Sequence, residues 1–125
     1  MNRRVTAVVD DMFFAAKIRT TAEHLGVSLS FARNSEAFLR SVGESRPDLI
    51  IVDLHSQKFD VIELARRLKS IEQVRSVPLL GFLSHVQTAL KQQAEEAGYD
   101  RVLARSVFTK DLAGILMGAA LQDDS

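Results

Sequence analysis

The chain has 125 residues, 46% of them apolar, which suits one compact domain with its own core, since domains cluster near ~100–150 residues. Sixteen Lys and Arg balance sixteen Asp and Glu, and no basic stripe with interleaved aromatic residues is present, so direct nucleic-acid binding is not expected. The absence of cysteine excludes disulfides, thiolate metal sites and cysteine nucleophiles.

The N-terminal residues do not have the pattern of a signal or membrane segment. The mostly apolar run after Arg4 is only five residues long, and Asp10 and Asp11 end it. We therefore expect a cytoplasmic protein with no membrane association. We also expect a single domain over residues 1–125, with its core at about 4–121 and no output domain.

Five short, largely apolar runs, each followed by a helical pattern, predict a parallel sheet built from βαβ units. Runs such as Leu49–Val52 lack polar alternation, as expected for central strands covered by helices on both faces. The predicted strands are Val5–Val9, Ser28–Ala32, Leu49–Val52, Pro78–Leu83 and Arg101–Ala104. We expect an α/β fold of the flavodoxin-like (βα)5 type, a doubly wound five-stranded parallel sheet with strand order 2-1-3-4-5.

Apolar spacing and capping residues predict the helices. The buried face of the first helix is formed by Phe14, Ile18, Ala22 and Leu25. Gly26 ends this helix. A capping-box-like motif at residues 60–63 begins the third helix. Its buried face is formed by Val61, Leu64, Leu68 and Ile71.

The remaining helices have weaker boundaries. Asn34 or Ser35 can cap the second helix. Residues 84–87 have the form of a capping box for the fourth helix, which Gly98 ends. The last helix is predicted over about 110–121.

Three carboxylates are predicted to meet at one edge of the sheet. Asp10 and Asp11 follow the first strand and Asp53 follows the third, and strand order 2-1-3-4-5 makes these strands neighbours. Their mutual repulsion requires a cation among them or a proton on one of them. Mg²⁺ takes oxygen ligands and leaves positions for water and phosphate, and a carboxylate beside it can attack phosphorus. The residues predict phosphoryl transfer to an aspartate; the alternative is that these acids cap helices.

These motifs resemble those of the response-regulator receiver family over essentially the whole chain. Residues 8–11 are similar to the family's first acidic pair, and residues 47–53 are similar to its phosphoacceptor strand. The resemblance implies a Mg²⁺ site formed by Asp10, Asp11, Asp53 and the backbone carbonyl of His55. It also implies that Asp53 accepts a phosphoryl group from a sensor histidine kinase or phosphotransfer protein, and that the chain is not an enzyme beyond self-phosphorylation and self-dephosphorylation.

The end of the fourth strand departs from the family pattern. Leu83 stands where the family has a hydroxyl residue, and a leucine cannot hydrogen-bond a phosphoryl oxygen. Ser84 can contact the phosphate in its place only if the strand end is bulged by one residue, because neighbouring side chains point to opposite faces. The alternative role of Ser84 is N-cap of the fourth helix. Val102 similarly stands at the family's aromatic switch position.

The segment after the fifth strand departs as well. Arg105 corresponds to the family's lysine and keeps a positive charge that can pair with Asp53 or its phosphate; the alternative is an exposed loop arginine. Ser106 replaces the proline that the family places after a cis bond, and a cis bond before another residue costs roughly 3–4 kcal/mol. With Val107 inserted, we expect a remodelled loop.

Two histidines lie at positions that tune phosphate lifetime in receivers. His55 comes two residues after Asp53, and His85 comes two residues after Leu83. An imidazole there can orient water and changes its charge near neutral pH. The alternatives are two solvated loop histidines, or a zinc site that joins His55, His85 and Asp53.

Three functions are therefore open. The first is a stand-alone phosphoacceptor that signals through a downstream protein. The second is a phosphorylation-independent interaction module that binds a protein, or itself as a homodimer, through the face of the fourth helix, fifth strand and fifth helix. The third, an enzyme that binds flavin or nucleotide, is disfavoured because residues 10–14 lack the glycines of a phosphate-binding loop.

Overall fold

The structure of the protein is a computed structural model that describes residues 3–84 and 88–118. Its centre is a five-stranded parallel sheet with strand order β2-β1-β3-β4-β5, as predicted. The strands are β1 (Arg4–Val8), β2 (Ser28–Phe31), β3 (Leu49–Asp53), β4 (Leu79–Leu83) and β5 (Arg101–Ala104). Each bound lies within one residue of the predicted bound.

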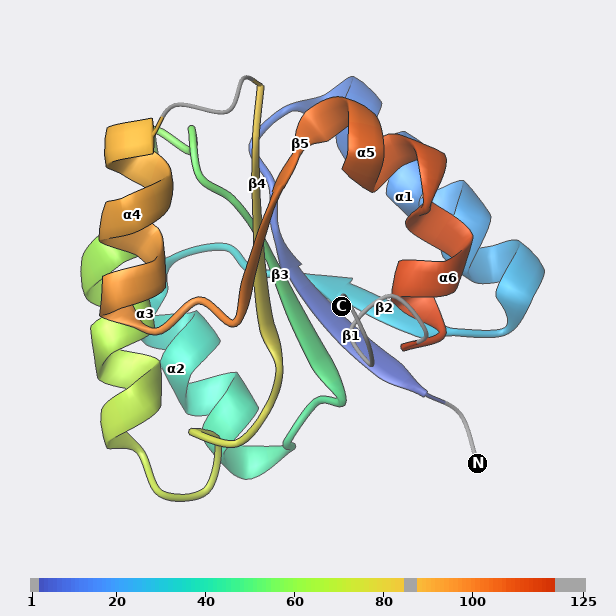
Figure 1. Ribbon diagram of the computed structural model, residues 1–125. Coiled ribbons are helices and arrows are strands. Elements are labelled where there is room, and N and C mark those ends of the chain that lie inside the picture. The colour runs from blue at the N-terminus through green and yellow to red at the C-terminus, as the bar shows by residue number, and fades with distance from the viewer. Residues whose placement is uncertain (1–2, 85–87, 119–125) are drawn as a thin grey trace.

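Helices cover both faces of the sheet. They are α1 (Met12–Leu25), α2 (Ser35–Glu44), α3 (Val61–Ser70), α4 (Thr88–Ala97), α5 (Arg105–Lys110) and α6 (Leu112–Leu116). Figure 1 shows α2, α3 and α4 on one face and α1, α5 and α6 on the other. Within the described ranges, no helix is long and apolar enough to cross a membrane.

The sheet lies between two hydrophobic clusters, one under each helical layer, and the side chains of β3 alternate between them. On β3, Ile50 and Val52 join the cluster beneath α2, α3 and α4, whereas Leu49 and Ile51 join the cluster beneath α1, α5 and α6. All five residues of β3 are buried. Asp53, which follows Val52, is therefore a carboxylate at the end of a fully buried strand.

Capping residues fix the helix starts that the sequence predicted. Asn34 caps α2, because its side-chain oxygen accepts the Ala37 N–H at 2.8 Å. Asp60 caps α3 through the Glu63 N–H at 3.1 Å. Gly26 ends α1 in the left-handed conformation (φ 72°), which a residue with a Cβ adopts only with strain.

The predicted last helix over about 110–121 is wrong at its start. The chain becomes helical at Arg105, directly after β5, and the helix breaks at Asp111 before α6 begins. The fully buried Phe108 lies in α5, with its ring centroid 4.4 Å from that of Phe82 on β4. This packing pulls the segment against the sheet, so that a helix start replaces the expected remodelled loop. The predicted end at Leu121 and most of the predicted 84–87 capping box lie outside the described residues.

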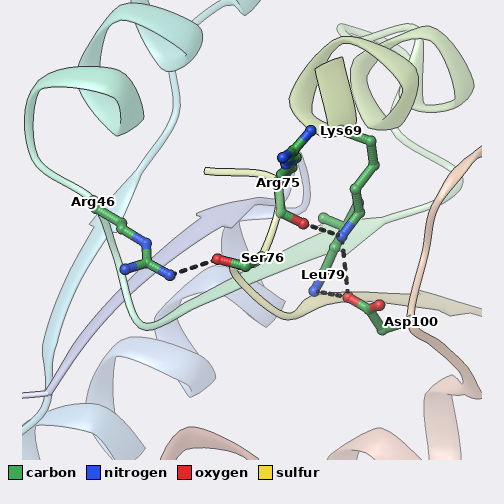
Figure 2. A network of polar contacts seen from close by, with 6 residues as sticks. All are labelled: Arg46, Lys69, Arg75, Ser76, Leu79 and Asp100. Atoms are coloured by element: carbon green, nitrogen blue, oxygen red, sulfur yellow. Dashed lines mark hydrogen bonds and ion pairs between the residues drawn. The ribbon is translucent and has the colours of Figure 1, made fainter. Parts of the chain in front are cut away.

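A polar network connects the elements at the end of the sheet where β4 and β5 begin (Figure 2). The Lys69 Nζ donates to the Arg75 carbonyl at 3.0 Å and lies 3.4 Å from Asp100 Oδ2. The same Asp100 oxygen accepts the Leu79 backbone N–H at 2.8 Å, and Arg46 donates to Ser76 Oγ at 2.7 Å. The turn before β5 is thereby joined to the start of β4 and to the end of α3.

Asp100→Ala is expected to lower the free energy of unfolding by about 1–2 kcal/mol, because it leaves the Leu79 N–H without its acceptor and Lys69 without its ion pair. Urea unfolding followed by circular dichroism measures this change. Glu95→Ala, at an exposed acid of α4, is the matched control and should stay within about 0.5 kcal/mol. Equal stabilities of the two variants would show that the network does not hold this end of the sheet.

Candidate functional site

Two neighbouring strands deliver the acidic residues to the carboxyl edge of the sheet. β1 and β3 are paired in parallel, with Val8 opposite Val52. Asp53 is the last residue of β3, and Asp10 and Asp11 follow β1. The structure thus brings the three predicted carboxylates to the same edge, which is where ligands bind in open parallel sheets.

Asp10 holds the loop between β3 and α3. Its Oδ1 accepts a hydrogen bond from Ser56 Oγ at 2.9 Å. Its Oδ2 accepts the backbone N–H groups of Gln57 at 2.7 Å and Lys58 at 3.3 Å. The sequence reasoning did not assign Ser56 a role; its position three residues after Asp53 was the available signal. Asp10 therefore fixes the loop that follows Asp53.

Asp11 serves as the N-cap of α1, which is the alternative role that the sequence offered for these acids. Its Oδ1 accepts the backbone N–H groups of Phe13 at 2.9 Å and Phe14 at 3.1 Å. Its Oδ2 lies 3.3 Å from the Arg105 Nη2. The hydrogen bond from the Phe14 N–H, with smaller contributions from Arg105 and Phe13, holds the pKa of Asp11 below its ordinary value.

Asp53 is 8% exposed and is the one buried polar or charged residue in the described part of the chain. Its Oδ1 accepts the His55 backbone N–H at 2.9 Å. Burial raises the pKa of Asp53, and the negative charge of Asp10 adds to the rise; the His55 N–H and the positive charges of Arg105 and His55 oppose it. The buried carboxylate is therefore the group whose ionised form most needs a nearby positive charge.

The sequence suggested that Arg105 pairs with Asp53 or its phosphate, but in the structure Arg105 pairs with Asp11. Its guanidinium forms the ion pair with Asp11, and its Cζ lies 4.1 Å from the centroid of the Phe14 ring. The local reason is that Arg105 belongs to the first turn of α5, beside the start of α1. Its positive charge nevertheless acts on Asp53, because it opposes the rise in the pKa of that carboxyl.

His55 and Ser84 meet at the rim of the site. The His55 Nε2 lies 3.3 Å from Ser84 Oγ, and both residues are exposed. The His55 carbonyl, which the family resemblance assigns to the metal shell, accepts a long hydrogen bond of 3.5 Å from Gln57 Nε2. His85 lies outside the described residues. The position that carries the family's hydroxyl is occupied by Leu83, whose side chain is buried in the apolar cluster beneath α3 and α4.

The donor types at this edge fit a hard divalent cation, because Asp10, Asp11 and Asp53 supply the carboxylate oxygens that Mg²⁺ takes. Each carboxylate accepts hydrogen bonds from protein donors. Among the residues that the structure describes, no three acidic, histidine or cysteine side chains are grouped closely enough to hold an ion. The donor types of the site therefore fit Mg²⁺, whereas the spacing of the described side chains does not bring three of them onto one ion.

The chain resembles known proteins along nearly its whole length. It is 31% identical over 102 residues to a gliding motility regulatory protein of Myxococcus xanthus, an alignment that covers 82% of this chain and 13% of that protein. The chain spans about half or less of the length of the curated relatives that it matches.

Solved structures share its fold. The chemotaxis response regulator CheY4 of Vibrio cholerae superposes with a TM-score of 0.82 at 19% identity, over 95% of this chain and 99% of that one. The receiver domain of a Pseudomonas aeruginosa sensor histidine kinase, solved with a magnesium ion coordinated in its active-site cleft, has a TM-score of 0.80 at 20% identity, over 94% of this chain and 96% of that one. The model of the response regulator receiver domain family matches residues 5–116. The chain therefore belongs to the response regulator receiver domain family.

Proposed function

We propose that this receiver accepts a phosphoryl group on Asp53 from a sensor histidine kinase or phosphotransfer protein and signals through a downstream protein partner. The observation that carries the proposal is the buried carboxylate at the end of the central strand β3, the single one within residues 3–84 and 88–118. Its Oδ1 is oriented by the His55 N–H. In the described ranges no protein donor reaches Oδ2, and no buried side-chain oxygen lacks a partner, so Oδ2 faces the solvent side of the site.

In this proposal Asp53 Oδ2 attacks the phosphorus of the donor, and the bond between the phosphorus and its leaving group breaks. Asp10, Asp11, Asp53 and the His55 carbonyl would hold Mg²⁺. The ion would supply positive charge where the carboxylates and the phosphoryl oxygens repel one another. Ser84, at 3.3 Å from the His55 ring, and Arg105 are the side chains proposed to contact the phosphoryl oxygens. His55 and His85 are proposed to tune the lifetime of the phosphate.

A phosphorylation-independent interaction module is the second candidate function. It is favoured by Leu83, which is 1% exposed and packed into the core, so that it offers the site no hydroxyl. Val102 is aliphatic and buried on β5, where the family has an aromatic switch residue. In this alternative the face of α4, β5 and α5 binds a protein or a second copy of the chain without a phosphate signal.

Incubation of the protein with Mg²⁺ and acetyl phosphate is expected to add one phosphoryl group, which intact mass spectrometry detects. Asp53→Asn should abolish the addition, because it removes the nucleophilic oxygen. Asp111→Asn, at an exposed acid between α5 and α6, is the matched control and should be labelled like the wild type. Labelling that persists in Asp53→Asn would place the acceptor elsewhere, and a wild type that is neither labelled nor able to bind Mg²⁺ would favour the second candidate.

In metal-free buffer, Asp53→Asn is expected to unfold at higher urea concentration than the wild type at pH 7. Because burial raises the pKa of folded Asp53 above 3.8, the wild type loses stability as the pH rises from about 4 through that raised pKa. The difference between the two proteins should therefore shrink as the pH falls toward 4.

Asp11→Asn is expected to change the stability at pH 7 in the opposite direction. The folded pKa of Asp11 is lowered, so this carboxylate contributes stability above its unfolded pKa and loses it as the pH falls through the folded pKa. The variant should be less stable than the wild type at pH 7 and equal to it in strong acid. If the stability differences of the Asp53 and Asp11 variants from the wild type changed with pH in the same direction, burial would not be the dominant effect at Asp53 or capping would not be the dominant effect at Asp11.

A further inference from the structure

The start of α1 binds a cation that belongs to the chain itself. The Arg105 Nη2 lies 3.3 Å from Asp11 Oδ2, and the Arg105 Cζ lies 4.1 Å from the centroid of the Phe14 ring. Asp11 caps α1 and Phe14 lies in its first turn, so both contacts are made with the same end of one helix. A guanidinium placed on an aromatic face and beside a carboxylate is attracted by both.

The position of this guanidinium is set by rigid elements. The Phe14 ring packs against Phe82 of β4 and Phe108 of α5, with centroid separations of 5.1 Å and 5.8 Å. Phe82 and Phe108 stack at 4.4 Å and are buried. Arg105 follows β5 with no intervening loop and lies in the first turn of α5. The Phe14 ring, held in place by Phe82 and Phe108, is therefore the surface on which the arginine lies.

The two oxygens of Asp11 are divided between different partners. Oδ1 accepts the Phe13 and Phe14 N–H groups and thereby caps the helix. Oδ2 accepts the Arg105 guanidinium. A divalent cation that binds Asp11 without uncapping α1 must therefore use the oxygen that Arg105 contacts.

We propose that Arg105 is a built-in competitor of Mg²⁺ for Asp11 Oδ2 and thereby sets the metal affinity of the site. The inference rests on the proposed function in one respect, that Asp11 is a metal ligand. Mg²⁺ and the guanidinium need the same oxygen and repel each other, so binding of the ion releases the arginine from Asp11. The field of Arg105 already reaches Asp53, and the released guanidinium offers its planar set of N–H donors beside the phosphoryl acceptor.

Isothermal titration calorimetry with MgCl₂ at constant ionic strength tests the proposal without phosphorylation. Arg105→Gln removes the competing charge and is expected to lower the Mg²⁺ Kd by about threefold to tenfold. Arg105→Lys keeps the charge but loses the planar stacking on Phe14, so its Kd should fall between the two. Lys110→Gln removes the same charge from an exposed position of the same helix and is the matched control, which should bind like the wild type.

An NMR titration of ¹⁵N-labelled protein gives a second readout. In the wild type, the Arg105 Nε–H resonance is expected to shift with the same Mg²⁺ midpoint as the Phe13 and Phe14 amides that Asp11 caps. The spectrum of the Arg105→Gln protein also shows whether the variant is folded.

Equal or weaker Mg²⁺ binding by folded Arg105→Gln would overturn the inference while leaving the metal-dependent function in place. Tightening of the same size in Lys110→Gln would also overturn it, because net charge would then explain the effect. Absence of Mg²⁺ binding in every protein would overturn both the inference and the metal-dependent function.

Discussion

The parallel pairing of β1 with β3 is the constraint on which the functional end of the molecule depends. It places Asp10, Asp11 and Asp53 at one edge of the sheet, where like charges repel. The chain compensates by giving each carboxylate its own donors: a loop for Asp10, a helix end and an arginine for Asp11, and one backbone N–H for Asp53. The carboxylate with the fewest protein donors, Asp53, is also the most buried of the three.

These compensating contacts also organise the elements around the site. Asp10 holds the β3–α3 loop through Ser56, Gln57 and Lys58. Asp11 begins α1 and joins it to α5 through Arg105. A ligand that competes for the oxygens of Asp10 therefore acts on the loop. A ligand that competes for those of Asp11 acts on α1 and α5. The hydroxyl and aromatic positions of the family are occupied here by Leu83 and Val102, so these contacts are the ones that join the site to its surroundings in this chain.

Local sequence signals predicted most of the fold. Largely apolar runs predicted the strands, and Gly26, Asn34 and Asp60 predicted helix ends, because each acts through its own backbone neighbourhood. The start of α5 and the partner of Arg105 could not be predicted in this way. Both depend on the packing of Phe14, Phe82 and Phe108, three rings that are far apart in the sequence and meet only in the folded chain. The acids of the site were found because each follows a predicted strand, and the carboxyl ends of parallel strands meet at one edge of the sheet.

The central claim is that Asp10, Asp11 and Asp53 act as one divalent-cation site despite their separate protein partners. Mg²⁺ titration followed by the side-chain carboxyl ¹³C resonances of these residues tests it most directly. The account predicts that all three resonances shift with a common midpoint, together with the amide of Gln57 as Asp10 releases the loop. Shifts confined to one carboxylate, or midpoints that differ among the three, would contradict a shared site.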